Sequence, residues 1–268
     1  MRVLTWNLWG RFGPWERRQD AISEVIGSCE ADVVCLQEVW SSEDGIDQAR
    51  RLAEAHGYQW CRTPERFWRG VSVGNAVFSR WDITEHAAVP LPNATGRSGH
   101  RRLLFAAVAA PFGRVPVFCT HLAYRFDESE LRQRQVSIVA REVADRLGDP
   151  ESDFPALLCG DLNAVPTSDE IRMLTGERPP PVSGMTFTDC WAIVGDGPGW
   201  TWDAANPHLV HAAWPRRRLD YVMVTWPRPK PTGNPLTARL VGETASGGVV
   251  PSDHYGVLVE LTEPPVDP

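Results

Sequence analysis

Leu157-Leu158-Cys159-Gly160-Asp161-Leu162-Asn163 is an apolar run that ends in a glycine, a carboxylate and an amide. This pattern predicts a buried strand followed by a tight turn. Asp161 and Asn163 should then lie just beyond the carboxyl end of the strand, where α/β folds keep their chemistry. Gly-Asp-x-Asn is also ordinary turn chemistry, so the stretch alone does not separate a catalytic turn from a structural one.

The composition is that of an ordinary globular protein. The chain has 268 residues, of which 43% are hydrophobic and 23% charged, and this length is sufficient for one large core. Because no linker or repeat divides it, we predict one domain over residues 1–262 and a flexible tail over 263–268. The net charge of −7 argues against a protein that holds nucleic acid by bulk charge.

The cysteines and the hydropathy of the chain bear on its location. None of the six cysteines has zinc-site spacing, and Cys35, Cys119 and Cys159 lie in apolar runs, as reduced core residues do. The chain begins without an apolar signal segment, and no run is long enough to span a membrane. We therefore expect a cytoplasmic protein, monomeric and with free thiols.

Apolar runs and helical periodicity alternate along the chain and indicate a layered α/β sandwich. Strands are predicted at 3–7, 32–38, 75–79, 103–109, 115–121, 157–159, 219–224 and 255–261. Helices are predicted at 15–29, 43–56, 127–147, 167–174 and 187–194. The segments 62–73, 90–99, 178–184 and 195–217 are predicted to be loops.

Most of the predicted strands end in a polar side chain, although a core strand gains nothing from such an ending. Such residues follow segments that are far apart in the sequence, which indicates a shared rim: Asn7, Glu38, His121, Asp161 with Asn163, and Asp253 with His254. Converging carboxylates and amides form a hard oxygen site that suits Mg²⁺ or Mn²⁺. The two histidines favour charge stabilisation or proton transfer over zinc ligation.

These segments also carry an ordered set of short motifs. In chain order they are Thr-Trp-Asn-Leu, Leu-Gln-Glu-Val, Gly-Asn-Ala-Val-Phe-Ser-Arg, Thr-His-Leu, Gly-Asp-Leu-Asn, Arg-Leu-Asp-Tyr-Val and Ser-Asp-His. The set resembles the endonuclease/exonuclease/phosphatase superfamily, which includes nucleases, sphingomyelinases and inositol polyphosphate phosphatases. The resemblance runs from Asn7 to His254. It implies a four-layer α/β sandwich, with two packed, mainly antiparallel β-sheets flanked by helices.

The resemblance also implies a divalent metal at one side of the site. Glu38 matches the metal-binding glutamate of the superfamily, and Asn7 matches the amide beside the metal and the phosphate. Asp253 matches a second aspartate on the metal side. The cofactor implied is Mg²⁺ or Mn²⁺.

The remaining matched residues have catalytic roles in the superfamily. Asp161 matches the aspartate that orients or deprotonates the attacking water, and Asn163 matches the amide that helps to hold this water and the phosphate. His254 matches the histidine that stabilises charge on the phosphorane, and Asp220 matches its carboxylate partner. His121 matches the second active-site histidine of the deoxyribonuclease and sphingomyelinase branches.

Substrate contacts are predicted for Asn75, Tyr124, Trp202 and Arg218. For each residue the pattern leaves a structural alternative open: Asn75 could cap a strand, Tyr124 could belong to a helix-entry loop, and Arg218 could pair with an acidic residue. The predicted loops hold several tryptophans, which could form a pocket wall or seal the loops over the sheets: Trp9, Trp40, Trp68, Trp200, Trp202 and Trp214. The arginines of 97–102 and 216–218 are interpreted as solvated surface.

The function expected is metal-dependent hydrolysis of a phosphoester by in-line attack of water. A small or lipid-like substrate is favoured over duplex DNA because of the acidic charge balance. Two alternatives remain open: a nuclease that acts on DNA or RNA, and a binding module that has lost catalysis. The complete set of matched residues argues against the binding module.

Overall fold

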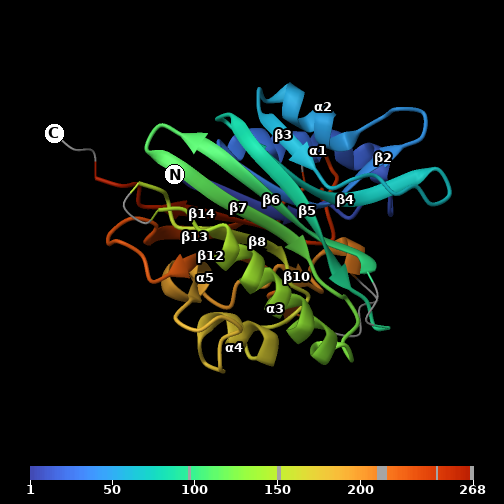
Figure 1. The fold of residues 1–268 in the computed structure, drawn as a ribbon. Helices are drawn as coiled ribbons and strands as arrows, with labels where there is room; N and C mark the ends of the chain where they lie inside the picture. The colour runs from blue at the N-terminus through green and yellow to red at the C-terminus, as the bar shows by residue number, and fades with distance from the viewer. Residues whose placement is uncertain (96–97, 150–151, 210–215, 246, 266–268) are drawn as a thin grey trace.

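Two six-stranded sheets form the centre of the molecule in this computed structural model, which describes residues 1–95, 98–149, 152–209, 216–245 and 247–265. Helices lie on the outer sides of the paired sheets (Figure 1). Most neighbouring strands are antiparallel, and each sheet contains one parallel pair. The predicted α/β sandwich with two mainly antiparallel sheets is confirmed. No helix in the described ranges is both long and apolar enough to cross a membrane.

The first sheet joins the two ends of the chain, because the first strand pairs with the last. Its strands are, in spatial order, β13 (Pro235–Val241), β14 (Gly256–Leu261), β1 (Arg2–Asn7), β2 (Val33–Ser42), β4 (Val71–Ser79) and β3 (Gln59–Arg62). Two helices, α1 (Trp15–Cys29) and α2 (Gln48–Ala55), cover its outer face. Their apolar residues Ile22, Ile26 and Leu52 pack against the sheet.

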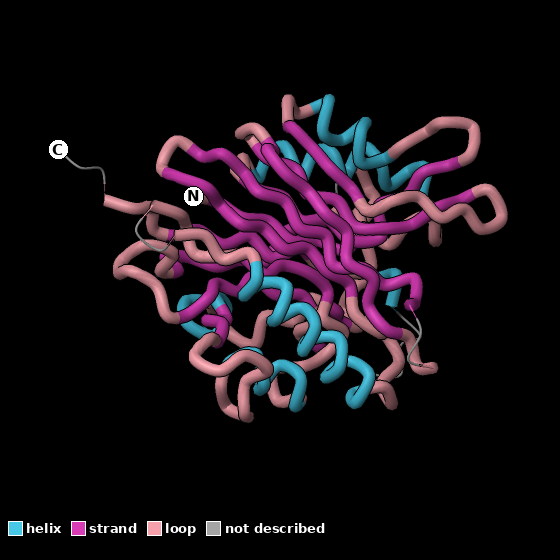
Figure 2. Tube along the Cα trace, viewed as in Figure 1, coloured by secondary structure: helices cyan, strands magenta, loops and turns pink. Residues whose placement is uncertain are grey.

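The second sheet contains the stretch that began the sequence analysis. Its strands are, in spatial order, β5 (Ile83–Pro92), β6 (Ser98–Ala110), β7 (Gly113–His121), β8 (Leu157–Asp161), β12 (Asp220–Trp226) and β9 (Thr186–Asp189). The helices α3 (Ser129–Asp145) and α4 (Asp169–Thr175) pack on its outer face. Figure 2 shows the strands of both sheets between these outer helices. The smaller elements are α5 (Cys190–Val194), η1 (Pro207–Leu209) and the pair β10 (Trp202–Asp203) and β11 (Arg216–Arg217).

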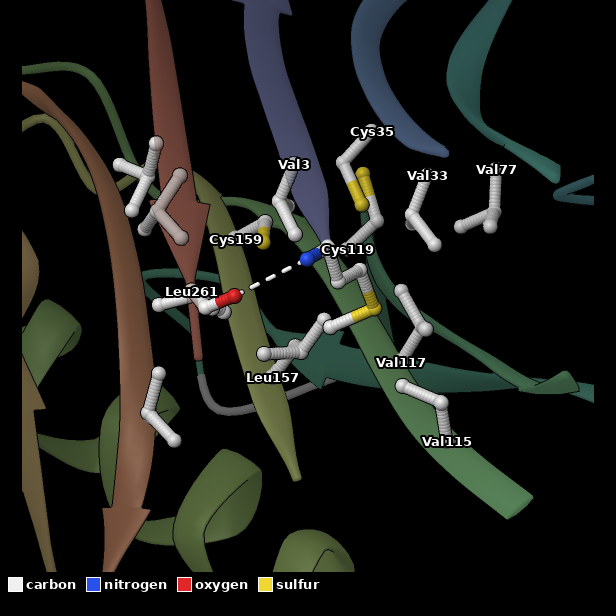
Figure 3. Packing of buried hydrophobic residues seen from close by; sticks show 14 of the residues in the cluster. Val3, Val33, Cys35, Val77, Val115, Val117, Cys119, Leu157, Cys159 and Leu261 are labelled. Atoms are coloured by element: carbon white, nitrogen blue, oxygen red, sulfur yellow. Dashed lines mark hydrogen bonds between the residues drawn. The ribbon is translucent and has the colours of Figure 1, made fainter. Parts of the chain in front are cut away.

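The core between the sheets consists of valines, leucines and thiols. Figure 3 shows Cys35, Cys119 and Cys159, which come from β2, β7 and β8, among Val3, Val117 and other apolar side chains. All six cysteines are buried and free. Burial raises the pKa of the Cys35 thiol well above its usual value. The predicted free thiols of the core are confirmed.

Strand direction brings the polar strand ends to one edge of both sheets. The parallel pairs β1–β2 and β7–β8 place Asn7 opposite Gln37, the residue before Glu38 in β2, and His121 directly opposite Asp161. β12 runs antiparallel to β8, so its first residue, Asp220, also lies opposite Asp161. His254 lies two residues before the start of β14. This geometry, which the sequence pattern could not supply, creates the predicted rim.

Two helix predictions are corrected by the structure. The helix predicted at 43–56 begins only at Gln48, because β2 continues to Ser42 and a turn follows it. The Asp47 side chain caps this helix by accepting a hydrogen bond from the Arg50 N–H. In the segment predicted as one helix at 187–194, residues up to Asp189 form β9, and only Cys190–Val194 are helical. Pairing of β9 with β12 explains the difference, because tertiary pairing overrides local propensity.

Several strand boundaries also differ from the predictions. β3, β5 and β13 were not predicted, and all three lie at or near a sheet edge, where polar residues and proline are tolerated. β4, β5 and β6 extend into segments predicted to be loops. The predicted tail is anchored at its start, because Glu263 forms a 2.9 Å ion pair with the Met1 amino group. Residues 266–268 lie outside the described residues.

Arg18 organises the segment that follows β1. Its guanidinium is completely buried, and burial lowers its pKa to about 10. It donates hydrogen bonds of 2.8 to 3.1 Å to five backbone carbonyls, those of Leu8, Trp9, Gly10, Phe12 and Pro251. This one side chain therefore ties the loop after Asn7 to the segment that leads to Asp253.

Replacing Arg18 with methionine should destabilise the protein by on the order of 3 kcal/mol, because buried carbonyls would lose their donors. Urea denaturation of Arg18→Met and of the control Arg17→Met, which changes an exposed neighbour on α1, measures this difference. Equal free energies of unfolding for the two variants would contradict the role given to Arg18.

Candidate active site

The Asp161 carboxylate is the centre of the site. It is 1% exposed, and its Oδ2 accepts a hydrogen bond of 3.0 Å from the Asn7 side-chain amide. The same oxygen lies 3.3 Å from Nε2 of His121 and 3.9 Å from Nε2 of His254. Its Oδ1 accepts from the backbone N–H of Asn163 at 2.9 Å. One carboxylate therefore touches side chains from both sheets.

Local backbone geometry orients the two residues nearest to this carboxylate. Asn163 has a φ of 50°, and its side chain donates to the Leu122 carbonyl at 3.2 Å. Asparagine tolerates this left-handed conformation better than most residues. The Asn7 side-chain oxygen accepts from the Trp9 N–H at 2.9 Å, which turns the amide nitrogen toward Asp161.

Glu38 is oriented by a bulge in β2. The pairing of β2 with β4 shifts register between Leu36 and Val39, and Glu38 itself has a φ of 56°. Bulges re-aim side chains near functional sites, and the strain of a positive φ is often found there. The Glu38 carboxylate remains accessible to solvent and approaches Nδ1 of His121 at 3.9 Å.

His254 and Asp220 form a buried pair. Nδ1 of His254 lies 2.8 Å from Oδ2 of Asp220. Burial opposes a charge on the imidazole, but the carboxylates of Asp220 and Asp161 outweigh it and raise the pKa of His254 well above its usual value. Burial, with the positive charges of Arg101 and His254, lowers the pKa of His121. The site therefore contains one charged and one neutral imidazole at neutral pH.

Two carboxyl groups of the site have raised pKa values. Burial, reinforced by the charge of Asp220, raises the pKa of Asp161 to about 7. Burial also raises the pKa of Asp253 to about 6, against the charge of the adjacent His254. Groups whose pKa is moved toward neutrality by burial and charge are characteristic of catalytic sites.

A profile of the Endonuclease/Exonuclease/phosphatase family matches residues 4–254, which is nearly the whole chain. The chain belongs to this family. The residues of the site are spread over the matched range, from Asn7 to His254. The predicted resemblance is therefore confirmed, and the coarse chemistry of the family, phosphoester hydrolysis, comes with it.

Two curated relatives share part of the chain. The inositol phosphosphingolipids phospholipase C of Schizosaccharomyces pombe is 33% identical over 136 residues, which are 46% of this chain and 31% of that protein. Protein angel homolog 2 of Homo sapiens is 27% identical over 173 residues, which are 58% of this chain and 30% of that protein. The chain thus spans about a third of the length of these two relatives.

Solved structures match the fold more completely. The crystal structure of an endonuclease/exonuclease/phosphatase from Beutenbergia cavernae has a TM-score of 0.73 and 28% identity, and covers 97% of this chain and 71% of its own. D. rerio TDP2, complexed with single strand DNA product, has a TM-score of 0.77 at 19% identity, with 97% of both chains covered. The second match is a likeness of fold alone.

The donor set of this family member fits a hard divalent cation. Glu38 and Asp253 offer carboxylate oxygens, and Asn7 offers a side-chain amide oxygen. In the part of the chain that the structure describes, no cysteine lines the cavity that contains Glu38. Burial raises the pKa of Asp253, and the charge of Glu38 adds to this shift. A buried carboxylate with a raised pKa gains from a cation that neutralises it.

Asp161, Asp220 and His254 also lie close enough to share an ion, since one polar atom of each lies within 4.8 Å of the others. We assign this trio differently. Asp220 and His254 already engage each other through the 2.8 Å contact, so the trio is better described as a charged histidine between two carboxylates. The second oxygen of Asp220, Oδ1, is buried and has no hydrogen-bond partner among the residues that the structure describes.

The four predicted substrate-contacting residues have different positions. Asn75 is buried beside Glu38 and His121 and donates to the Arg102 carbonyl at 2.9 Å, so it holds strands together at the site. Tyr124 is 65% exposed in the loop after β7. Trp202 is half-buried in β10, opposite Arg217. The structure does not bring Arg218 to the site: its buried guanidinium pairs with Asp189 at 2.8 Å, which was the structural alternative.

The tryptophans are distributed over several environments. Trp40, which was predicted to lie in a loop, is 2% exposed in β2 and packs edge-on against Trp15. Trp9 packs against His208, with ring centroids 4.7 Å apart. Trp68 is 72% exposed, and Trp200 carries the Arg216 guanidinium over its ring. Trp214 and Arg97 lie outside the described residues.

Sequence reasoning missed Arg101 and Ser252. Arg101 was interpreted as solvated surface, whereas it lines a cavity with Glu38 and His121. Ser252 is buried and donates to the Asn7 carbonyl at 2.7 Å, which fixes β1 relative to the His254 turn. The Ser-Asp-His motif contained a signal for Ser252, but the sequence contains no signal that separates Arg101 from its arginine neighbours.

Replacing Asp220 with asparagine should lower the pKa of His254, because burial would then act without its main compensating charge. NMR titration of the histidine side chains in the wild type and in Asp220→Asn measures the change, with the exposed His86 as internal reference. An unchanged His254 titration would show that the 2.8 Å contact is not an ion pair.

Proposed function

We propose that this protein hydrolyses phosphoester bonds of a small or lipid-like substrate by in-line attack of water, with Mg²⁺ or Mn²⁺ as cofactor. The observation that carries the proposal is the position of Asp161. Its carboxylate contacts Asn7 on one side and faces the His254–Asp220 pair on the other. A group that can accept a proton thus lies beside a group that can stabilise negative charge.

Asp161 is the residue that we assign to the water. Its pKa of about 7 lies near the working pH, where a general base is most effective. The Asn7 amide and the Asn163 N–H fix the orientation of the carboxylate, so one oxygen can accept a proton without a change of rotamer. Asn163 is assigned to help in holding the water.

His254 is assigned to the charge that develops on phosphorus. Asp220 holds the imidazole through Nδ1 and favours its charged form, which leaves Nε2 directed toward Asp161. A fixed cation in a buried site stabilises a phosphorane far more than it would in water. His121, 3.3 Å from Asp161, is neutral and can donate a hydrogen bond from its N–H to a substrate oxygen.

Glu38, Asn7 and Asp253 are the residues that would hold the divalent ion. When bound, such an ion would withdraw charge from an oxygen of the phosphoester. The oxygen-rich donors are the ones that Mg²⁺ and Mn²⁺ prefer. The bulge at Glu38 and the hydrogen bond of Asn7 both hold these donors in place before an ion arrives.

The choice of a small or lipid-like substrate is supported by charge and by one relative. The net charge of −7 does not favour a polyanion. The S. pombe relative is named a phospholipase C that acts on inositol phosphosphingolipids. Tyr124 and Phe126, 65% and 48% exposed in the loop after β7, offer apolar surface near the site. We further propose a cytoplasmic location, supported by the six free thiols.

Hydrolysis of a chromogenic phosphodiester and of the matching monoester tests the proposal. Turnover should require Mg²⁺ or Mn²⁺, disappear with a chelator and return when the ion is restored. The variant Asp161→Ala should be inactive. Preference for the diester would direct the search to lipids and nucleic acids, whereas preference for the monoester would direct it to small metabolites.

His254→Ala should lose about a thousandfold or more in kcat, because the charge opposite the phosphorane is removed. The matched control is His86→Ala, which removes an exposed histidine on β5. Wild-type turnover in His254→Ala would overturn the assignment. If the wild type hydrolyses DNA or RNA with a steep salt dependence, the nuclease alternative replaces the small-substrate proposal.

A further inference from the structure

A cavity opens next to the proposed metal side of the site. It lies between β4, β6 and the end of β7, has a volume of about 160 Å³, and shares Glu38 and His121 with the active site. The other walls are formed by Thr63, Val73, Gly74, Asn75, His100, Arg101 and Arg102. None of these wall residues except Asn75 belongs to the proposed catalytic or binding set.

The size of the cavity limits what it can hold. Pockets for whole small-molecule ligands are typically about 300 to 1,000 Å³. A space of about 160 Å³ instead fits one compact group of a larger substrate. At Gly74, an added Cβ atom would lie 2.2 Å from Oγ1 of Thr63, so only glycine leaves this wall open without moving its neighbour.

The cavity is lined by positive charge in addition to the carboxylate of Glu38. Arg101 and Arg102 both line it, and both are only partly exposed. Among the described residues, the structure gives the Arg101 guanidinium no hydrogen bond and no ion pair. Burial lowers its pKa, and the carboxylates of Glu38 and Asp161 oppose that shift. A partly desolvated guanidinium without a partner is costly unless an anion occupies the space beside it.

The position of Arg101 is fixed by the strand that carries it. The Arg102 carbonyl accepts from the Asn75 amide at 2.9 Å and from the Thr120 hydroxyl at 3.4 Å. These bonds join the end of β6 to β4 in the other sheet and to β7. Arg101 therefore lies on a strand end held by side chains from both sheets, at the same edge as His121.

We propose that this cavity binds a second anionic group of the substrate, a phosphate on the same molecule as the phosphoester that is cleaved, through Arg101. The inference rests on the proposed function and narrows it to substrates with two phosphates. The planar fork of arginine matches phosphate oxygens in two-point contacts, which a lysine cannot reproduce. Two sources supply this chemistry: a small bisphosphate and the neighbouring phosphate of a nucleic-acid strand.

Matched chromogenic substrates test the proposal and separate the two sources. One pair is a nucleoside 5′-nitrophenyl phosphodiester with and without a 3′-phosphate. The other is a nitrophenyl phosphodiester of glycerol with and without a second phosphate. The wild type should prefer the doubly charged member of one pair by on the order of tenfold to a hundredfold in kcat/KM, the effect of a charged hydrogen bond. The pair that shows the preference identifies the source.

Arg101→Gln should reduce this preference to about twofold or less, mainly through KM, and Arg101→Lys should restore only part of it. The matched control is Arg51→Gln, which removes one exposed positive charge from α2 and should retain the wild-type preference. A change of preference in the control would indicate a long-range charge effect and would contradict a specific contact.

Calorimetry with inorganic pyrophosphate separates a failure of the inference from a failure of the proposed function. If the wild type hydrolyses phosphodiesters without preferring a second phosphate in either pair, the inference is wrong and the function stands. If no phosphoester is hydrolysed, the proposed function fails, and pyrophosphate then decides the inference. Binding that Arg101→Gln weakens at least tenfold, and Arg51→Gln does not, supports the cavity as an anion site; equal binding by both variants overturns it.

Discussion

The buried carboxylate of Asp161 is the constraint on which the site depends. A charged group in this environment is unfavourable unless it is compensated, and the compensation comes from the charge of His254, the Asn7 amide of the first sheet and the Asn163 N–H that follows β8 in the second. The compensating groups must therefore converge on one point. This requirement couples the packing of the two sheets to the geometry of catalysis, because a shift between β1 and β8 would break the 3.0 Å contact.

The rest of the molecule supports this convergence. Arg18 ties five carbonyls of the loop after β1 and of the segment before Asp253, and Ser252 bonds the Asn7 backbone. The apolar core between the sheets, with its free thiols, packs the strands against one another (Figure 3).

Much of the fold was predicted from local sequence patterns, and the elements that were predicted wrongly or missed have a common cause. Strands with apolar runs, such as those at 157–159 and 219–224, were predicted because buried strands are rich in apolar residues. β9 and β13 were missed or assigned as helix because their strand character comes from pairing with β12 and β14. For Arg218 the sequence left open substrate contact or pairing with an acidic residue. The structure pairs it with Asp189, which comes from β9.

The sequence by itself determined the class of fold, the free buried thiols and the set of polar residues that end the strands, because these depend on local periodicity and on residue type. Only the tertiary structure decided how those residues meet. A bulge in β2 orients Glu38, and Asp220 contacts His254. Arg101, together with Arg102, lines the cavity beside His121. Each of these depends on contacts between segments far apart in the chain, and such contacts leave no periodic trace in the sequence.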